Sequence, residues 1–147
     1  MHFCQRCVHC HSREGGNLLK TIYTQNAPEP IGPYSQAIQS GDFLFLSGQI
    51  PIDPQSGSLQ LFDGDIARQT ELVLKNIGAV LAAAKLNPAH VVKTTIFLTD
   101  LKNFPVVNEI YARFFGPHKP ARSTVEVSAL PKGVGIEIEV IATQQLD

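Results

Sequence analysis

An arginine and two glutamates in the last third of the chain are the residues best suited to bind a carboxylate and to move protons. Arg122 comes directly after Lys119-Pro120-Ala121, at the start of a predicted strand, where its planar guanidinium could hold a carboxylate through two parallel hydrogen bonds. A surface arginine that pairs with an acidic neighbour would show the same pattern. Glu137 and Glu139 lie two residues apart in the last predicted strand and therefore share one face. Both glutamates could simply be exposed to solvent on that face. Alternatively, one of them faces a closed cleft, in which burial raises the pKa of its carboxyl group towards the range useful for proton transfer.

Two further candidates lie in the first third of the chain. The motif Ser47-Gly48-Gln49 ends a predicted strand with a hydroxyl and a backbone N–H, and Tyr34 follows a proline-rich loop from which it could reach over a ligand. Ordinary packing would account for both equally well. The chain has no Ser/His/Asp order, phosphate-binding loop or dinucleotide fingerprint. Only His90 and His118 remain beyond the N-terminal segment, so the sequence does not indicate acid–base chemistry by histidine.

The N-terminal segment differs in composition from the rest, because it contains all three cysteines and three of the five histidines. Cysteine thiolates and imidazoles bind zinc, and Cys4, Cys7, Cys10 and His11 follow one another at short spacing. A closed zinc site usually takes its second pair of ligands from a separate loop, and an iron–sulfur cluster needs a fourth cysteine. We therefore predict no metal and no cofactor. We interpret residues 1–18 as a flexible or non-native extension, with metal binding as the alternative, and residues 19–147 as one domain.

Composition narrows the classes of partner. The formal net charge is −1 and no run of basic residues occurs, so the sequence does not indicate nucleic acid as a partner. No apolar stretch has the length of a membrane span, and the N-terminus lacks the apolar core of a secretory signal. We expect a cytoplasmic protein without a membrane segment. The charged fraction of 17% is low for a small domain, which fits either surface covered by partner subunits or a well-packed monomer.

Hydrophobic periodicity predicts the elements that position these residues. Predicted strands are Thr21–Thr24, Gln36–Gln39, Phe43–Ile50, Val91–Thr99, Ser123–Val127 and Ile136–Thr143. Predicted helices are Ile66–Lys85 and Phe104–Phe115, with Asp65 and Asn103 as N-caps. Strict alternation would place Phe43, Phe45, Ser47 and Gln49 on one face of their strand, and Leu44, Leu46 and Ile50 on the other. The second helix is expected to turn Phe104, Val107, Tyr111 and Phe114 inwards.

The order β-β-β-α-β-α-β-β predicts an α+β fold, in which a mixed sheet carries both helices on one face. The stretch Val91–Thr99 is apolar on both faces and is typical of a central, buried strand. The other face of the sheet would then need a cover, and no predicted element is left to supply it. Association with further subunits is the natural solution.

Several motifs occur in an order that resembles the reactive intermediate deaminase (RidA, or YjgF) family, from about Lys20 to the end of the chain. They are Ile31-Gly32-Pro33-Tyr34-Ser35-Gln36-Ala37, Ser47-Gly48-Gln49-Ile50-Pro51, Val92-Lys93-Thr94-Thr95-Ile96-Phe97-Leu98, Asn108-Glu109-Ile110-Tyr111, Pro120-Ala121-Arg122-Ser123, Leu130-Pro131-Lys132 and Ile136-Glu137-Ile138-Glu139. The resemblance implies a chorismate-mutase-like fold that assembles as a homotrimeric barrel, with helices outside and ligand sites in the clefts between subunits.

The resemblance also implies an activity: hydrolysis of 2-iminobutanoate or 2-iminopropanoate to the 2-keto acid and ammonia, without a cofactor. In this family pattern Arg122 clamps the substrate carboxylate with help from the backbone N–H of Gly48. Glu137 activates the attacking water or shuttles the proton that leaves with ammonia. Tyr34 and Ser47 shape the pocket and orient the imine, and Tyr34 is counted with Arg122 and Glu137 among the catalytic residues. Asn108 and Thr124 are expected among the substrate-binding residues, Asn108 in a supporting role.

Two departures from the family pattern bear on function. Many deaminase-type members have cysteine where this chain has Thr124, so the hydroxyl replaces the thiol or only backbone groups matter there. The connection 116–120 is short compared with some members.

An endoribonuclease or translation inhibitor is one alternative function, against which the neutral charge argues. A non-catalytic trimer that binds small keto acids is another.

Overall fold

Residues 19–146 are described by a computed structural model of the chain. Residues 1–18 and 147 lie outside the described residues, and with them the cluster of Cys4, Cys7, Cys10 and His11. The interpretation of the N-terminal segment as an extension, its alternative as a metal site, and the domain boundary before Leu19 therefore stay predictions.

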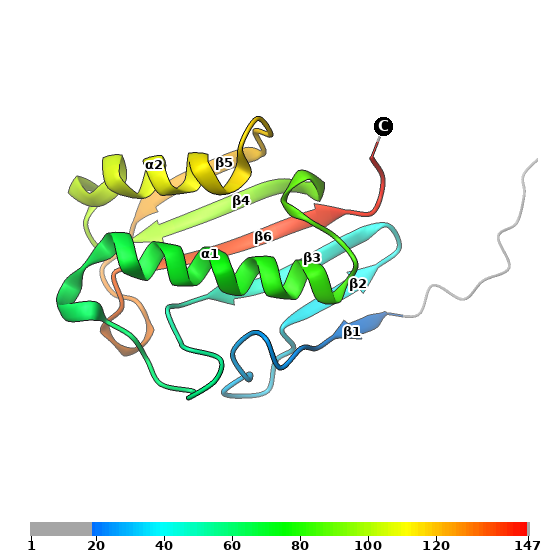
Figure 1. Cartoon of the computed structure of the whole chain (residues 1–147), viewed down its shortest axis with the longest axis horizontal. Coiled ribbons are helices and arrows are strands. Elements are labelled where there is room, and N and C mark those ends of the chain that lie inside the picture. Colours follow the sequence, from blue (N-terminus) through cyan, green and yellow to red (C-terminus); the bar gives the residue numbers. More distant parts are fainter. Residues whose placement is uncertain (1–18, 147) are drawn as a thin grey trace, which may run out of the picture.

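Six strands form one sheet, and the two α-helices lie side by side across one face of it (Figure 1). The strands are β1 (Lys20–Ile22), β2 (Ala37–Ser40), β3 (Phe43–Gln49), β4 (Val91–Leu98), β5 (Ala121–Glu126) and β6 (Ile136–Thr143). The helices are α1 (Ile66–Ala83) and α2 (Phe104–Phe115), with short 3-10 turns η1 (Phe62–Gly64), η2 (Pro88–His90), η3 (Leu101–Asn103) and η4 (Pro131–Gly133). The strand order is β1-β2-β3-β6-β4-β5, in which only β4 and β5 run parallel. The predicted element order and the α+β mixed sheet are thus confirmed, and the element ends differ from the predicted ones by no more than two residues.

The core lies between the helices and the inner face of the sheet. Along β6 every second side chain is buried: Ile136, Ile138, Val140 and Ala142. These side chains belong to one cluster with the apolar stripe of α1, whose fully buried members are Val73, Ile77, Val80 and Leu81. Burying a side chain of this size contributes about 1.5–3 kcal/mol relative to leaving it in water. The apolar residues at helical spacing in α1 and at every second position in β6 therefore pack into a single core.

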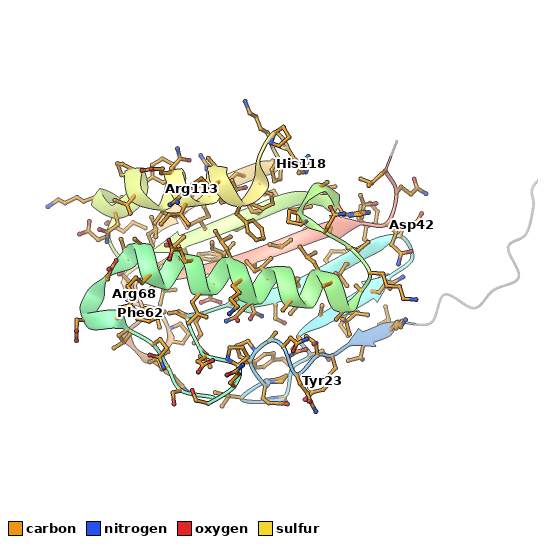
Figure 2. All side chains as sticks on the ribbon, viewed as in Figure 1. Tyr23, Asp42, Phe62, Arg68, Arg113 and His118 are labelled. Atoms are coloured by element: carbon orange, nitrogen blue, oxygen red, sulfur yellow. The ribbon has the colours of Figure 1, made fainter. Side chains whose placement is uncertain are left out.

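Helix α1 begins where the sequence predicts. The Asp65 carboxylate accepts hydrogen bonds from the backbone N–H groups of Ala67 (3.0 Å) and Arg68 (3.3 Å), which would otherwise lack partners. The Arg68 guanidinium also lies 4.3 Å from the centre of the Phe62 ring in the preceding turn (Figure 2). The helix ends at Ala83, two residues before the predicted end, because Lys85 adopts the left-handed region with a φ of 61°.

Helix α2 has its predicted bounds, but its predicted N-cap is wrong and its predicted inner face is only partly right. The Asn103 side chain makes no capping hydrogen bond, because the turn η3 runs directly into the helix and its own start is capped by Asp100, which accepts from the Lys102 N–H at 2.9 Å. The inward face is also rotated slightly. Its buried residues are Val107, Ile110, Tyr111 and Phe115, whereas Phe104 and Phe114 are only partly buried against the core.

A β-bulge in β3 breaks the predicted alternation of that strand. Leu46 pairs with Val140 and Gln49 pairs with Ile138, so three steps along β3 face two steps along β6. Gln49 is consequently buried on the same side as Leu46 and not beside Phe45, which is 48% exposed. The prediction that Gln49 shares a face with Phe45 is wrong, because alternation assumes an uninterrupted ladder.

The face of the sheet opposite the helices is open in the single chain. No helix or strand of residues 19–146 covers it (Figure 1). Phe43 and Phe45 are each 48% exposed there, and Val125 is 40% exposed. Strand β4 lies between two neighbours as predicted, yet its outward residues Thr95 and Phe97 are only half-buried. Burial on both faces is therefore wrong for one chain, because no helix or strand of residues 19–146 packs against the outward side chains of β4.

Candidate functional site

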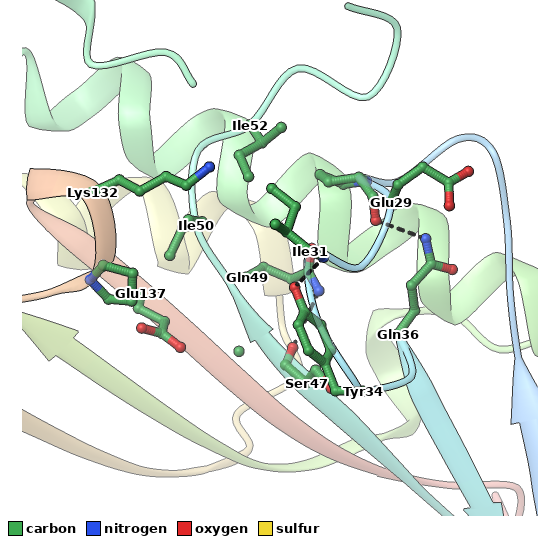
Figure 3. Close-up of a pocket in the computed structure, with 13 residues that line it drawn as sticks. Glu29, Ile31, Tyr34, Gln36, Ser47, Gln49, Ile50, Ile52, Lys132 and Glu137 are labelled. Atoms are coloured by element: carbon green, nitrogen blue, oxygen red, sulfur yellow. Dashed lines mark hydrogen bonds between the residues drawn. The ribbon is translucent and has the colours of Figure 1, made fainter. Parts of the chain in front are cut away.

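A cavity of about 410 Å³ lies where the end of β3 and the start of β6 meet the loop before β2 and the turn η4 (Figure 3). Four of the predicted site residues line it: Tyr34, Ser47, Gly48 and Glu137. The remaining lining residues are mostly apolar or come from the surrounding loops: Pro28, Glu29, Ile31, Gln36, Gln49, Ile50, Ile52, Pro131 and Lys132. A concave, largely apolar site with a few converging polar groups is typical of small-molecule binding.

The bulge in β3 brings Gly48 directly against the carboxyl group of Glu137. A Cβ atom at position 48 would lie 2.1 Å from Glu137 Oε1 and 2.9 Å from its Cδ. A side chain at position 48 would displace the Glu137 carboxyl group, so glycine at this position allows that group to sit against the β3 backbone. In Figure 3 the Glu137 carboxyl group points across the cavity towards this strand.

The two glutamates of β6 differ in environment, although both lie on the open face. Glu139 is exposed, whereas Glu137 is half-buried at the cavity. Burial raises the pKa of Glu137 above the ordinary glutamate value, and the negative charge of Glu139 adds to the rise. A carboxyl group that holds its proton closer to neutral pH is suited to general acid–base chemistry.

Ser47 and Tyr34 face the same cavity with defined hydrogen-bonding capacity. The Ser47 hydroxyl donates to the Ser35 carbonyl at 2.6 Å, so its oxygen is left as an acceptor for a ligand. The Tyr34 hydroxyl accepts from the Ile31 N–H at 3.2 Å and keeps its own proton to donate. The cavity thus offers an acceptor, a donor and a carboxyl group within one enclosure.

Arg122 is held against α2 on the helix side of the sheet. In the ladder between β4 and β5 it pairs with Thr94, which is buried and hydrogen-bonded to the Tyr111 hydroxyl at 2.7 Å. Its Nη1 donates to Asn108 Oδ1 at 2.7 Å, and its Cζ lies 4.9 Å from the centre of the Tyr111 ring and 5.2 Å from that of Phe104. The aromatic rings and the Asn108 amide orient the guanidinium and leave most of its N–H groups for a ligand.

Thr124 lies two residues along β5 and shares a face with Arg122. Its Oγ1 is buried and has no hydrogen-bond partner among residues 19–146. Buried hydroxyls are nearly always paired in folded proteins. This position therefore has an unused donor and acceptor close to the arginine.

The predicted site residues fall into two groups that do not meet within one chain. Glu137 pairs with Phe97 on the open face of the sheet, whereas Arg122 pairs with Thr94 on the helix face and does not line the cavity. We call Tyr34, Ser47, Gly48 and Glu137 the cavity half, and Asn108, Arg122 and Thr124 the arginine half. The chain carries both halves, but a site that uses both needs more than one copy.

Sequence reasoning did not single out Gln36 or Ile52 as cavity residues. Gln36 is only 2% exposed and uses its side-chain amide to bind the loop before β2. A signal for it was present, because the prolines of that loop leave carbonyl groups without neighbouring N–H donors. Ile52 lines the cavity from a loop, and its type alone carries no sign of that role.

Two kinds of feature are absent from the described residues: a cluster of metal ligands and a membrane-spanning helix. Within residues 19–146 no three histidine, cysteine, aspartate or glutamate side chains converge in a way that could hold a metal ion. In the same part of the chain, no helix combines the length and the apolar character needed to cross a membrane.

Comparisons with known proteins agree with one another. The sequence model of the family described as Endoribonuclease L-PSP matches residues 24–144. A RutC family protein of Pyrococcus horikoshii is 55% identical over 128 residues, which are 87% of this chain and 100% of the relative. Among solved structures, YyfA of Yersinia pestis, a protein of unknown function of the conserved Rid protein family, is 55% identical with a TM-score of 0.83, over 86% of this chain and 99% of that one. E. coli TdcF, solved with bound serine, is 44% identical with a TM-score of 0.80, over 86% of this chain and 99% of that one.

Proposed function

The chain belongs to the RidA/YjgF (endoribonuclease L-PSP) family, and from this premise we propose that it hydrolyses 2-imino acids to 2-keto acids and ammonia. One observation carries the proposal: a half-buried carboxyl group with a raised pKa, Glu137, lies against Gly48 in a cavity that also holds a hydroxyl donor. Imine hydrolysis needs a bound water and a group that can take up and return protons, and it needs no redox or metal chemistry.

The chemistry follows from the groups present. The substrate carboxylate binds the fork of Arg122 and the backbone N–H of Gly48. Glu137 takes a proton from water while the water oxygen forms a bond to the carbon of the protonated imine and the C=N π electrons move to nitrogen, which produces a neutral carbinolamine. Glu137 then returns the proton to the carbinolamine nitrogen, the C–N bond breaks with release of ammonia, and the hydroxyl proton passes back to Glu137 to leave the keto group. Proton transfer by a positioned side chain contributes about 10²–10⁴ in rate.

We further propose that the protein acts as a homotrimer, in which the arginine half of one copy completes the cavity half of its neighbour. Two observations support this assembly: the halves lie on opposite faces of one sheet, and the open face exposes Phe43 and Phe45. The bound serine of E. coli TdcF is a small molecule of amino-acid size on a relative. For this chain we propose a small 2-imino or 2-keto acid as ligand and the cytoplasm as its location.

The test is an assay in which an amino-acid oxidase generates 2-iminobutanoate and its decay is followed by trapping the imine. Purified protein should speed imine loss, and Glu137→Gln and Arg122→Ala should each remove most of that effect. Glu139→Gln is the matched control, because it removes a carboxylate from the same strand face outside the cavity and should keep activity within about threefold. The proposal fails if wild-type protein does not accelerate imine decay, or if Arg122→Ala matches the wild type.

Three further measurements separate the alternative functions. Light scattering should give three times the mass of one chain, and a monomer would refute the shared site. Binding of 2-oxobutanoate without any imine turnover would indicate a keto-acid-binding protein instead. RNA cleavage that survives both Glu137→Gln and Arg122→Ala would place a ribonuclease activity elsewhere on the molecule.

A further inference from the structure

The loop between β1 and β2 forms one wall of the cavity and carries Tyr34. It contains three prolines and contributes Pro28, Glu29 and Ile31 to the lining besides the tyrosine. Prolines supply carbonyl oxygens but no N–H donors, so this loop cannot satisfy its own backbone in a regular element. The buried residues Ala27 and Pro28 therefore need a donor from elsewhere in the chain for their carbonyl groups.

The Gln36 side chain is that donor. It is 2% exposed, and its Nε2 donates to the carbonyl oxygens of Thr24 (3.0 Å) and Pro28 (2.9 Å), with a longer contact to Ala27 (3.4 Å). Its Oε1 accepts from the Thr24 N–H at 2.8 Å. One amide therefore joins the two ends of the loop, as Figure 3 shows for its bond to the wall of the cavity. Only an amide of this length supplies both an acceptor and two donors.

The backbone at Gln36 is joined to the other wall of the cavity. The Ser47 N–H donates to the Gln36 carbonyl at 2.9 Å, and the Ser47 hydroxyl donates to the carbonyl of the preceding Ser35 at 2.6 Å. Tyr34 comes directly before these two residues. Tyr34 therefore lies in the segment 28–36, which is held at both ends. Ser35 and Gln36 are bound to β3 through their carbonyl groups, and Pro28 is bound by the Gln36 side-chain amide.

We propose that Gln36 is a positioning residue, which holds Tyr34 over the cavity by closing the loop from Thr24 to Gln36. The inference rests on the proposed imine hydrolysis for its kinetic consequence, but not for its structural one. Loss of the amide would remove the partner of the Thr24 N–H and of three loop carbonyls and would let the loop move away from β3. A displacement of about 1 Å of a group that orients the substrate costs about 100-fold in rate.

The decisive experiment is a double-mutant cycle between Gln36→Met and Tyr34→Ala. Gln36→Met keeps the length of the side chain and removes its hydrogen bonds, so kcat/KM for 2-iminobutanoate should fall by about 10- to 100-fold. In a protein that already lacks the Tyr34 ring, the same change should cost less than about threefold, because Gln36 acts through that ring. Additive losses would overturn the inference, since a purely structural glutamine would impair both backgrounds equally.

Leu86→Ala is the stability control. Leu86 is buried in the core after α1 and lies outside the cavity, so its truncation should lower the free energy of unfolding without changing kcat/KM of the folded protein. Hydrogen exchange of residues 24–36 should speed up in Gln36→Met but not in Leu86→Ala. Unchanged exchange in that segment would overturn the inference. If Gln36→Met does not fold, Gln36→Asn takes its place in the cycle, because it keeps a neutral amide on a side chain shortened by one methylene.

The failure of this inference and the failure of the proposed function are distinguishable. If wild-type protein has no imine activity, the cycle is repeated on the affinity for 2-oxobutanoate measured by calorimetry. Non-additive losses of affinity together with faster loop exchange would then uphold the role of Gln36 while the deaminase proposal fails. Active wild-type protein with additive losses would uphold the deaminase proposal and overturn the role of Gln36.

Discussion

The close approach of the Gly48 backbone to the Glu137 carboxyl group leads to a specific prediction for Gly48→Ala. The new Cβ would lie 2.1 Å from Glu137 Oε1, whereas an unstrained carbon–oxygen contact is about 3.4 Å. The carboxyl group must therefore move by about 1.3 Å or rotate out of the cavity. Because the crowded atoms are the end of a flexible side chain, that movement should have little effect on folding, and the backbone of residue 48 is not in a conformation reserved for glycine.

The same movement should have a large effect on catalysis. A misplacement of about 1 Å costs about 100-fold in rate, which corresponds to about 2.7 kcal/mol of transition-state stabilisation. We expect kcat for 2-iminobutanoate to fall by about this factor in Gly48→Ala, with a smaller change in KM, because Glu137 acts on the reacting atoms. The free energy of unfolding in urea should change by less than about 1 kcal/mol.

Gly78→Ala is the matched control for this prediction. Its Cβ would meet Phe114 at an ordinary distance of 3.7 Å, and it lies within α1, where alanine is favoured over glycine by about 0.5–1 kcal/mol. This variant should be slightly more stable than the wild type and equally active. The reasoning is refuted if Gly48→Ala keeps wild-type kcat, or if it loses the same factor again in a Glu137→Gln background where no carboxylate remains to be displaced.

Three further predictions follow from the two halves of the site and the open face. Glu137→Gln should unfold at a higher urea concentration than the wild type at pH 7, because the folded state raises the pKa of Glu137 and so penalises its ionised form. This advantage should vanish as the pH falls below about 4.3, where the wild-type carboxyl is protonated in both states, and a gap that persists there would contradict the assignment. Arg122→Lys should raise KM by about tenfold or more with a smaller change in kcat. Lysine keeps the positive charge but lacks the planar guanidinium, which binds Asn108 and a carboxylate at the same time. An unchanged KM in steady-state assays would show that the arginine does not bind the substrate. Phe45→Asp should shift the light-scattering mass from trimer to monomer, because it places a charge on the open apolar face, and an intact trimer would show that another surface forms the interface.

The order and type of the elements were predictable because they depend on local interactions. The helical spacing of apolar residues in α1 and α2 and the cap at Asp65 involve neighbours within one or two turns of the chain. Alternation along β6 likewise needs only the residues of that strand. The mixed sheet with one helical layer follows from that order, since each apolar face must find another one to pack against.

The bulge in β3 and the role of Gln36 were not predictable in this way. The bulge arises from the pairing of Leu46 and Gln49 with two residues of β6, which lie about ninety positions away. Gln36 has the same type as several exposed glutamines in this chain. Its importance comes from the three carbonyl groups that the proline-rich loop brings around it.

The two glutamates of β6 show which features the sequence determines and which depend on the tertiary structure. The sequence by itself determined that Glu137 and Glu139 share a face, that Arg122 lies near the start of a strand, and that the motifs around them match a known family. Tertiary structure alone decided that Glu137 is the half-buried member against Gly48, and that Arg122 lies on the opposite side of the same sheet. The physical reason is that alternation along a strand indicates only the face of the sheet towards which each side chain points. Burial, which sets the pKa of a carboxyl group, depends on distant segments that fold against it.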